Sequence, residues 1–132
     1  MAIKDAPTKV IDDVGQEYDP TDVVGYMENT YPEMTSEFKK IQRDQYELFC
    51  KKQYDYGPQN IAGGTILKTP EDIKLSLLGI WFRMNDKIER MKTLLMRNGV
   101  NSVEGEPVTD SFSDVSYYGV MAHVVARGKW AK

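Results

Sequence analysis

A long amphipathic segment in the second half of the chain constrains the fold more than any other feature. Its apolar side chains recur at steps of 3, 4, 4, 3 and 4 residues, at Leu77, Ile80, Met84, Ile88, Met91 and Leu95. This spacing repeats on one face of an α-helix, so it predicts a helix over residues 70–97 with a buried apolar stripe. Thr69 followed by Pro70 is typical of a helix start, and Asn98-Gly99 is typical of a helix stop.

Shorter segments with the same periodicity predict further helices. Residues 35–52 and 107–127 each carry an apolar face, and residues 22–31 form a weaker helix that is limited by Pro32. The first face comprises Phe38, Ile41, Gln45, Leu48 and Phe49. The second comprises Val115, Tyr118, Ala122 and either Val125 or Ala126. Because no alternating strand of useful length occurs, the sequence predicts an all-α bundle of three main helices plus a minor N-terminal helix.

The first 20 residues differ from the rest of the chain. They are polar, include Pro7, Gly15 and Pro20, and show no apolar periodicity. Such a segment buries too little surface to order itself, so we expect an arm or a partner-bound strap. The sequence therefore divides into residues 1–32, an arm with a short helix, and residues 33–132, a helical domain.

Composition excludes several classes of protein. A chain of 132 residues that is 41% hydrophobic can bury one core. Its net charge of -3 excludes a surface that coats nucleic acid, and its single cysteine, Cys50, excludes a disulfide framework and a Cys-rich zinc module. No apolar run is long enough to span a membrane, and the N-terminal residues carry acids where a signal peptide needs an apolar stretch. We therefore expect a cytoplasmic protein that binds neither a membrane nor bulk nucleic acid.

The predicted long helix carries a charged run beside its apolar stripe. The charged residues lie three or four positions apart, on successive turns, at Arg83, Asp86, Lys87 and Arg90. One interpretation is a solvated face with ion pairs inside the helix. The other is a surface that grips polyphosphate, because Arg offers a planar fork for phosphate oxygens, Lys a point charge and Asp an oxygen ligand for Mg²⁺.

Three carboxylates follow one side of the last predicted helix at four-residue steps, at Glu106, Asp110 and Asp114. Like charges at this spacing repel one another, so the arrangement suggests a neutralising partner, either a divalent cation or the basic face of the long helix. Alternatively, Glu106 and Asp110 stabilise the positive N-terminal end of the helix. That explanation does not extend to Asp114, which lies about two turns inside it.

A third candidate stands at the end of the first main helix, in the run Lys51–Ile61. Gly57 permits a backbone conformation that other residues rarely adopt, and Asn60 can satisfy a base edge or a carbonyl group. Tyr54 or Tyr56 offers a ring for stacking. The alternative is an ordinary capped turn, in which ion pairing and helix ending explain the same residues.

Four blocks of sequence carry a family resemblance, and they are Lys51–Ile61, Gly79–Arg90, Glu106–Tyr118 and Gly128–Trp130. In this order they resemble the first nucleotide modification associated domain, a family found largely in phage and bacterial genomes. The helical layout with paired acidic motifs is also similar to the MazG-like all-α nucleotide pyrophosphohydrolases, which hold Mg²⁺ with an E-x-x-E and an E-x-x-D motif. In this chain Asp44–Glu47 and Asp86–Glu89 have a related spacing, and the carboxylates at four-residue steps replace E-x-x-D.

The resemblance implies a Mg²⁺-dependent nucleoside triphosphate pyrophosphohydrolase that acts in phage nucleotide metabolism or DNA modification, in the host cytoplasm if the protein is phage-encoded. The metal ligands would be Glu106, Asp110 and Asp114, and the catalytic residues would be Asp86, Asp110 and Asp114. The phosphates would contact Lys52, Arg83, Lys87 and Arg90. The nucleoside would be positioned by Asp55 and Asn60, with Tyr56 stacked on the base.

Two other functions fit the same residues. A non-catalytic protein would capture a nucleotide with the basic residues and not turn it over. A scaffold partner of a DNA-modifying enzyme would use the N-terminal arm for docking. Because MazG-like proteins assemble as dimers or larger oligomers, the resemblance also implies a homo-oligomer, with Trp81, Phe82 and Tyr117 as interface residues.

Overall fold

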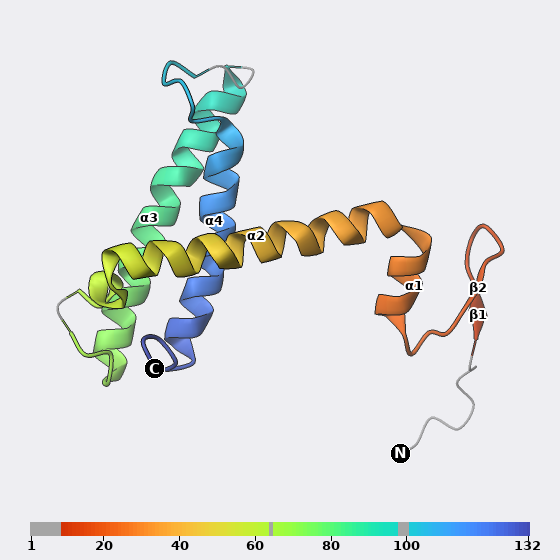
Figure 1. Cartoon of the computed structure of the whole chain (residues 1–132), viewed down its shortest axis with the longest axis horizontal. Coiled ribbons are helices and arrows are strands. Elements are labelled where there is room, and N and C mark those ends of the chain that lie inside the picture. Colours follow the sequence, from red (N-terminus) through yellow and green to blue (C-terminus); the bar gives the residue numbers. More distant parts are fainter. Residues whose placement is uncertain (1–8, 64, 98–100) are drawn as a thin grey trace. The chain divides into compact units, whose positions relative to one another are not determined.

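The computed structural model describes residues 9–63, 65–97 and 101–132, and these residues are mostly helical (Figure 1). In chain order the elements are β1 (Val10–Ile11), β2 (Glu17–Tyr18), α1 (Val23–Thr30), α2 (Pro32–Tyr56), the 3-10 turn η1 (Pro58–Ile61), α3 (Pro70–Met96) and α4 (Val108–Ala126). The prediction of an all-α fold is confirmed. None of the helices in the described ranges combines the length and the apolarity that crossing a membrane requires.

The chain divides into two compact units, unit 1 (residues 1–44) and unit 2 (residues 45–132). The division falls inside α2, whereas the sequence analysis separates the arm from the helical domain at residue 32. In unit 1 the first half of α2 contacts α1 through an ion pair between Lys39 and Glu28. In unit 2 the second half of α2 packs on α4. All the candidate site residues, from Lys52 to Asp114, belong to unit 2.

The helix α3 begins where the sequence predicts. The Thr69 hydroxyl oxygen accepts a hydrogen bond from the backbone nitrogen of Asp72 at 3.1 Å. Pro70 occupies the first turn, where its missing N–H costs nothing. The last helical residue is Met96, and the predicted stop at Asn98-Gly99 falls outside the described residues.

The buried face of α3 is rotated slightly from the predicted stripe. Four of the six predicted positions are buried or half-buried, at Leu77, Ile80, Met84 and Met91. The other two, Ile88 and Leu95, are 44% and 52% exposed, and Leu94 is buried instead. Covered side chains recur every seven residues, at Ile73, Ile80, Lys87 and Leu94. A seven-residue repeat is typical of a helix that follows a partner helix, so the partner selects the buried face.

That partner is α4, which runs antiparallel beside α3 (Figure 1). The most deeply buried side chains of α4, each no more than 2% exposed, are Ser111, Met121 and Val125. The predicted inward residues Val115, Tyr118 and Ala122 are half-buried. Of the two alternatives at the end of the helix, Val125 is buried and Ala126 is exposed.

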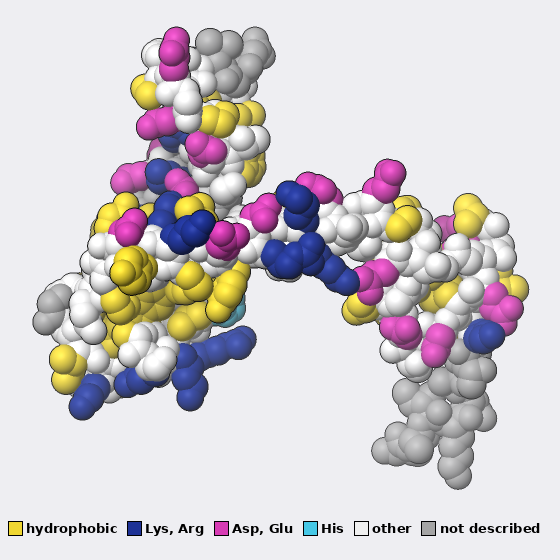
Figure 2. Space-filling model, in the orientation of Figure 1, with side chains coloured by type: hydrophobic (Ala, Val, Ile, Leu, Met, Phe, Trp, Pro, Cys, Tyr) yellow, Lys and Arg dark blue, Asp and Glu magenta, His cyan; other side chains and the backbone are white. Residues whose placement is uncertain are grey.

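The core of unit 2 is closed by Trp130, close to the end of the chain. Its buried ring joins a cluster that also contains Ile61, Ile80, Met121 and Val125. Its indole Nε1 donates a hydrogen bond to the carbonyl oxygen of Pro58 at 2.6 Å, which fastens the chain end to the turn after α2. Phe49 meets Trp130 edge to face, with ring centroids 5.8 Å apart. Figure 2 shows hydrophobic side chains gathered beside the second half of α2.

In unit 1 the expected arm is a β-hairpin over its described residues. Val10 pairs with Tyr18 and Ile11 pairs with Glu17 in two antiparallel strands. This local order differs from the expectation that the first 20 residues cannot order themselves; residues 1–8 lie outside the described part of the chain.

Asp12 is the reason for the difference. One of its carboxylate oxygens accepts hydrogen bonds from the backbone nitrogens of Val14 at 3.0 Å and Gln16 at 2.8 Å. The other oxygen accepts a hydrogen bond from the Tyr26 hydroxyl at 2.6 Å, and this bond lowers the pKa of Asp12. Side-chain capping of a turn orders a segment without any apolar periodicity, so hydrophobic patterning alone misses it.

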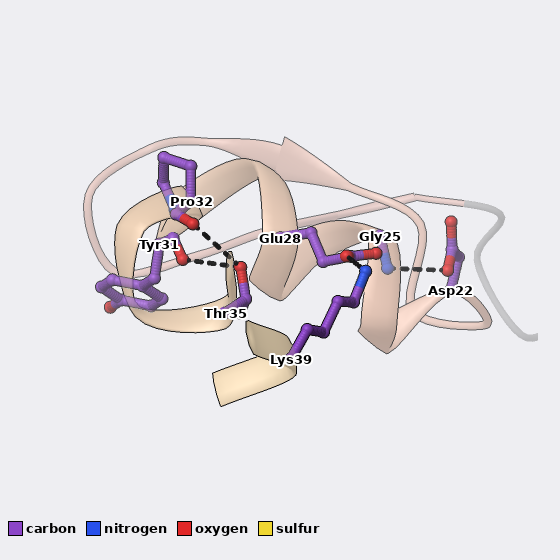
Figure 3. A network of polar contacts seen from close by, with 7 residues as sticks. All are labelled: Asp22, Gly25, Glu28, Tyr31, Pro32, Thr35 and Lys39. Atoms are coloured by element: carbon purple, nitrogen blue, oxygen red, sulfur yellow. Dashed lines mark hydrogen bonds and ion pairs between the residues drawn. The ribbon is translucent and has the colours of Figure 1, made fainter. Parts of the chain in front are cut away.

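The junction between α1 and α2 is held by local hydrogen bonds (Figure 3). The Asp22 carboxylate accepts from the backbone nitrogen of Gly25 at 2.9 Å and caps α1. The Tyr31 carbonyl accepts from the Thr35 hydroxyl at 2.9 Å. Pro32 fits the first turn of a helix, so α2 begins there and not at residue 35.

The predicted inward face of α2 is covered at only two of its five positions, both in the second half of the helix, where Leu48 is 48% exposed. Phe38 and Ile41 are 63% and 48% exposed, and no residue of α2 is fully buried. Gln45 and Phe49 are half-buried, and the Ser116 hydroxyl donates to the Gln45 side-chain oxygen at 3.4 Å. The periodicity thus predicts the helix but not how much of its apolar face is covered.

Two isoleucines of α3 test which face of this helix is buried. Ile80 is 1% exposed and Ile88 is 44% exposed. We expect Ile80→Ala to lower the free energy of unfolding by about 2–5 kcal/mol, because it leaves a cavity in a packed core. The control, Ile88→Ala, should cost about 1 kcal/mol or less. Urea denaturation followed by circular dichroism measures both values, and equal losses would contradict the described packing.

Candidate functional site

A pocket of about 290 Å³ opens in unit 2 where α2, η1, α3 and α4 come together. Its lining consists of Lys52, Gln53, Tyr56, Asn60, Arg83, Tyr117, Tyr118 and Met121. Four of the seven residues that the sequence nominates for substrate binding are among them, namely Lys52, Tyr56, Asn60 and Arg83. The fold therefore brings residues of three of the sequence blocks together, namely Lys51–Ile61, Gly79–Arg90 and Glu106–Tyr118.

The pocket carries two cationic side chains and no carboxylate in its lining. The Lys52 ammonium lies 5.5 Å from the centroid of the Tyr117 ring, in a cation–π contact. The Arg83 guanidinium donates to the Asn60 carbonyl oxygen at 3.4 Å, near the limit of a hydrogen bond. Among the described residues neither Lys52 nor Arg83 forms an ion pair. The pocket is therefore electropositive.

A polar pair on one wall of the pocket joins α2 to α4. The Gln53 side-chain nitrogen donates to the Tyr117 hydroxyl at 3.0 Å. Burial raises the pKa of Tyr117, so its phenol remains neutral at physiological pH. The Gln53 oxygen Oε1 is shielded from solvent and has no hydrogen-bond partner within the described part of the chain.

The turn after α2 gives the pocket its shape. The Gly57 nitrogen donates to the carbonyl oxygen of Gln53 at 2.9 Å, which ends the helix. Gly57 has a φ of 79°, in the left-handed region that favours glycine, and the chain reverses there toward Asn60. The Trp130 bond to Pro58 holds this turn from the other side. The prediction that Gly57 supplies a special backbone conformation is confirmed.

Two of the predicted phosphate ligands have other partners. Lys87 forms an ion pair with Asp114 at 3.0 Å, and the hydrogen bond between them raises the pKa of Lys87. Arg90 donates to the Ser111 hydroxyl oxygen at 2.7 Å and to the carbonyl oxygen of Glu106. Both contacts join α3 to the region around the start of α4, so these two side chains stabilise the helix pair and do not line the pocket.

Asp55 and Asp86 also lie outside the pocket lining. Asp55 borders a separate, open hollow with Cys50, Lys51 and Tyr54. Asp86 is exposed on α3, one turn beyond Arg83. Of the residues nominated for substrate binding, three of the four on α2 and η1 therefore line the pocket, but only one of the three on α3 does.

The predicted metal ligands do not form a metal site in this arrangement. Over residues 9–63, 65–97 and 101–132, no three or more Asp, Glu, His or Cys side chains gather as a metal ion requires. Asp114 is already paired with Lys87, while Glu106 and Asp110 are exposed. Because Mg²⁺ needs converging oxygen ligands, the set of Glu106, Asp110 and Asp114 does not fit it here. The dependence on Mg²⁺ stays a prediction.

Three lining residues were not nominated for binding by the sequence, namely Gln53, Tyr118 and Met121, and Tyr117 was assigned to an oligomer interface. Gln53 is next to Lys52 inside a block that the sequence analysis singled out. Tyr117 and Tyr118 belong to the apolar side of α4, where the sequence pattern predicts that an aromatic side chain is part of the core. Only contact between α2 and α4 shows that they border a cavity.

Comparison of the chain with family models, with curated proteins and with solved structures gave no match. The resemblance to the first nucleotide modification associated domain therefore rests on the sequence blocks themselves.

The hydrogen bond from the Trp130 indole to the Pro58 carbonyl leads to one prediction. Trp130→Phe keeps an aromatic ring in the core but removes the indole hydrogen bond. We expect it to lower the free energy of unfolding by about 1–3 kcal/mol, since the Pro58 carbonyl loses its donor and the smaller ring leaves space in the core. The control is Trp81→Phe on α3, which is 55% exposed and should change stability by about 0.5 kcal/mol or less. Thermal unfolding of both variants measures the difference. Equal midpoints would contradict a stabilising role for the hydrogen bond between Trp130 and Pro58.

The Lys87–Asp114 pair generates a second prediction. The side chains are 37% and 25% exposed, whereas the Lys40–Asp44 pair on α2 is 60% and 65% exposed. We expect Asp114→Asn to cost about 1 kcal/mol of unfolding free energy, and the control Asp44→Asn about 0.3 kcal/mol or less.

The contribution of Lys87 to the free energy of unfolding should fall at alkaline pH. Because the folded pKa of Lys87 is raised, the stabilisation is complete below its ordinary value of 10.5 and is lost as pH rises through the folded pKa. The stability difference between the wild type and Asp114→Asn should therefore shrink above this pH. Denaturation at a series of alkaline pH values measures it, and a difference independent of pH would contradict the assignment.

Proposed function

We propose that this chain is a cytoplasmic nucleotide-binding protein and that its pocket holds a phosphorylated nucleoside. The single observation that carries the proposal is the pairing of two cations, Lys52 and Arg83, with aromatic rings in a pocket that has no carboxylate in its lining. An anion is the ligand that such a pocket favours, because each cation lacks an ion-pair partner among the described residues.

The lining also matches the separate parts of a nucleotide. Arg83 offers the planar fork and Lys52 the point charge that bind phosphate oxygens. Tyr56 and Tyr118 offer ring faces for a base, and the Asn60 amide offers both a donor and an acceptor. The volume of about 290 Å³ is at the lower end of small-molecule pockets, so it favours a mononucleotide over a larger ligand.

The predicted pyrophosphohydrolase activity is the second candidate. Its support is that Asp86 and Asp114 lie one helical turn from the pocket residues Arg83 and Tyr118 on their helices. Since Mg²⁺ usually binds proteins through one or two carboxylates together with substrate phosphates, hydrolysis on this chain depends on a metal that arrives with the nucleotide.

A homo-oligomer remains part of the proposal. Trp81 and Phe82 are 55% and 61% exposed and contact each other edge to face, with ring centroids 5.3 Å apart. An exposed aromatic pair of this kind is typical of an interface. Tyr117, which the sequence assigns to the same surface, contacts Phe49 and Gln53 of its own chain.

The test is to incubate the purified chain with nucleoside mono-, di- and triphosphates, with and without Mg²⁺, while calorimetry records binding and chromatography separates the products. We expect nucleotide binding that Lys52→Met weakens by about 10–100-fold, because a charged hydrogen bond to phosphate is lost. The control is Lys51→Met, the neighbouring lysine, which is 72% exposed and pairs with Glu47. It should bind as the wild type does.

Each outcome decides between the candidate functions. Binding with intact nucleotide identifies a protein that sequesters nucleotides. Release of monophosphate and pyrophosphate only with Mg²⁺ identifies the pyrophosphohydrolase. If the wild type binds no nucleotide, or if Lys51→Met weakens binding as much as Lys52→Met, then the pocket is not the site, and the scaffold function becomes the better account.

A further inference from the structure

We propose that the first half of α2, residues 32–44, packs on the outer face of α3 in a second copy of this chain. The inference rests on the homo-oligomer that the proposed function includes, because it names the two surfaces that meet. It does not depend on the nucleotide pocket.

The first argument is that unit 1 has no core of its own in the part that the structure describes. None of residues 9–44 is buried, although they form two helical segments and a hairpin. A folded unit of this size needs buried apolar surface to offset the conformational entropy lost when its backbone becomes ordered. Unit 1 therefore needs a partner that covers its apolar side chains.

The second argument is an exposed apolar strip on the first half of α2. The strip consists of Met34, Phe38 and Ile41, which recur at steps of 4 and 3 residues and are all exposed. Alternating steps of 3 and 4 residues are typical of a helix that packs along another helix. The α2 strip therefore fits a helix that carries an apolar strip of its own.

The third argument is that unit 2 offers such a strip on α3. Leu75, Leu78 and Phe82 are exposed and recur at steps of 3 and 4 residues. They lie about half a turn around the helix from the buried Ile80, so they form the outer face of α3. Read in the antiparallel direction, the steps of this α3 strip equal those of the α2 strip. The two strips therefore match when the helices run in opposite directions.

The charges of the two units identify the occupant as a second copy. Unit 1 carries ten Asp and Glu against five Lys and Arg, whereas unit 2 carries twelve Lys and Arg against ten Asp and Glu. Unit 1 of one copy is therefore attracted to unit 2 of another, and two copies of unit 1 repel each other. This favours contact between the α2 strip and the α3 strip over contact between two α2 strips.

The charges beside the strips agree with this pairing. Glu37 lies about a quarter turn to one side of the α2 strip, and Lys74 lies about a quarter turn to the same side of the α3 strip. In an antiparallel pair of helices these sides face each other, so the carboxylate meets the ammonium group. Neither side chain has an ion-pair partner among the residues that the structure describes.

The experiment measures self-association of the full chain by sedimentation velocity, at concentrations up to about 100 µM. Phe38→Ser disrupts the α2 strip and Leu78→Ser disrupts the α3 strip. The matched controls, Tyr46→Ser on α2 and Leu95→Ser on α3, change exposed side chains outside the strips. Because all four side chains are exposed, the variants should keep their helices, which circular dichroism verifies.

We expect the wild type to associate and each strip variant to associate at least about tenfold more weakly, because a large apolar side chain is lost from the interface. The controls should associate as the wild type does. A 1:1 mixture of Phe38→Ser and Leu78→Ser should associate more tightly than either variant alone at the same total concentration. One variant keeps the α3 strip and the other keeps the α2 strip, so this rescue requires that the two different strips meet.

A charge reversal provides a second readout. Lys74→Glu should weaken association about three- to tenfold, since a carboxylate then faces Glu37. Lys92→Glu changes the net charge equally but lies almost three turns beyond Phe82 on the same helix, so it should have little effect.

The inference is overturned if the wild type sediments as a monomer at every concentration, or if either strip variant associates like its control. It is also overturned if the mixture associates no more tightly than the separate variants. Calorimetry measures nucleotide binding independently, so in each of these cases the pocket still stands as the nucleotide site. A chain that associates as expected but binds no nucleotide overturns the proposed nucleotide binding alone.

Discussion

The antiparallel packing of α3 against α4 is the interaction on which the rest of unit 2 depends. Covered side chains recur along α3 with a seven-residue repeat, from Ile73 through Ile80 and Lys87 to Leu94. This repeat keeps one face of a helix against a partner along its whole length. Ile80 of α3 and Met121 and Val125 of α4 form the centre of the core that results. The second half of α2 and the chain end then have a surface to pack on.

The pocket is a consequence of how α2 ends on that surface. Gly57 lets the chain leave the helix in a left-handed conformation, and Trp130 then holds the turn through Pro58. These two constraints bring Asn60 to the Arg83 guanidinium, while the last turns of α2 carry Lys52 and Gln53 to Tyr117. The pocket therefore forms only when these separate segments pack on the core.

The distribution of charge separates structural cations from those available to a ligand. Lys87 is neutralised by Asp114, and Arg90 is held by Ser111 and by the carbonyl oxygen of Glu106, so both serve the helix pair. Lys52 and Arg83 face a pocket with no carboxylate. These two half-buried cations have no counter-charge among the described residues, and the buried Gln53 oxygen without a hydrogen-bond partner lowers folding stability. Such local costs are typical of sites that bind a ligand.

The sequence by itself determined the helices, because periodicity, caps and breakers are local properties. It predicted the start of α3 at Thr69 and Pro70, the special backbone of Gly57, and four residues of the pocket lining. It could not determine which apolar residues are covered, since a stripe that contains Ile88 differs from the covered face by a rotation that only α4 selects. Apolar patterning also could not predict the hairpin of β1 and β2, because the hairpin depends on the hydrogen bonds of Asp12. Most of all, spacing along one helix groups Arg83 with Lys87 and Arg90, whereas the tertiary structure groups Arg83 with Lys52 and Asn60. Charges on one helix are neighbours by sequence, but a pocket is made by contact between helices, and only the packed structure decides which charges face a partner and which face a cavity.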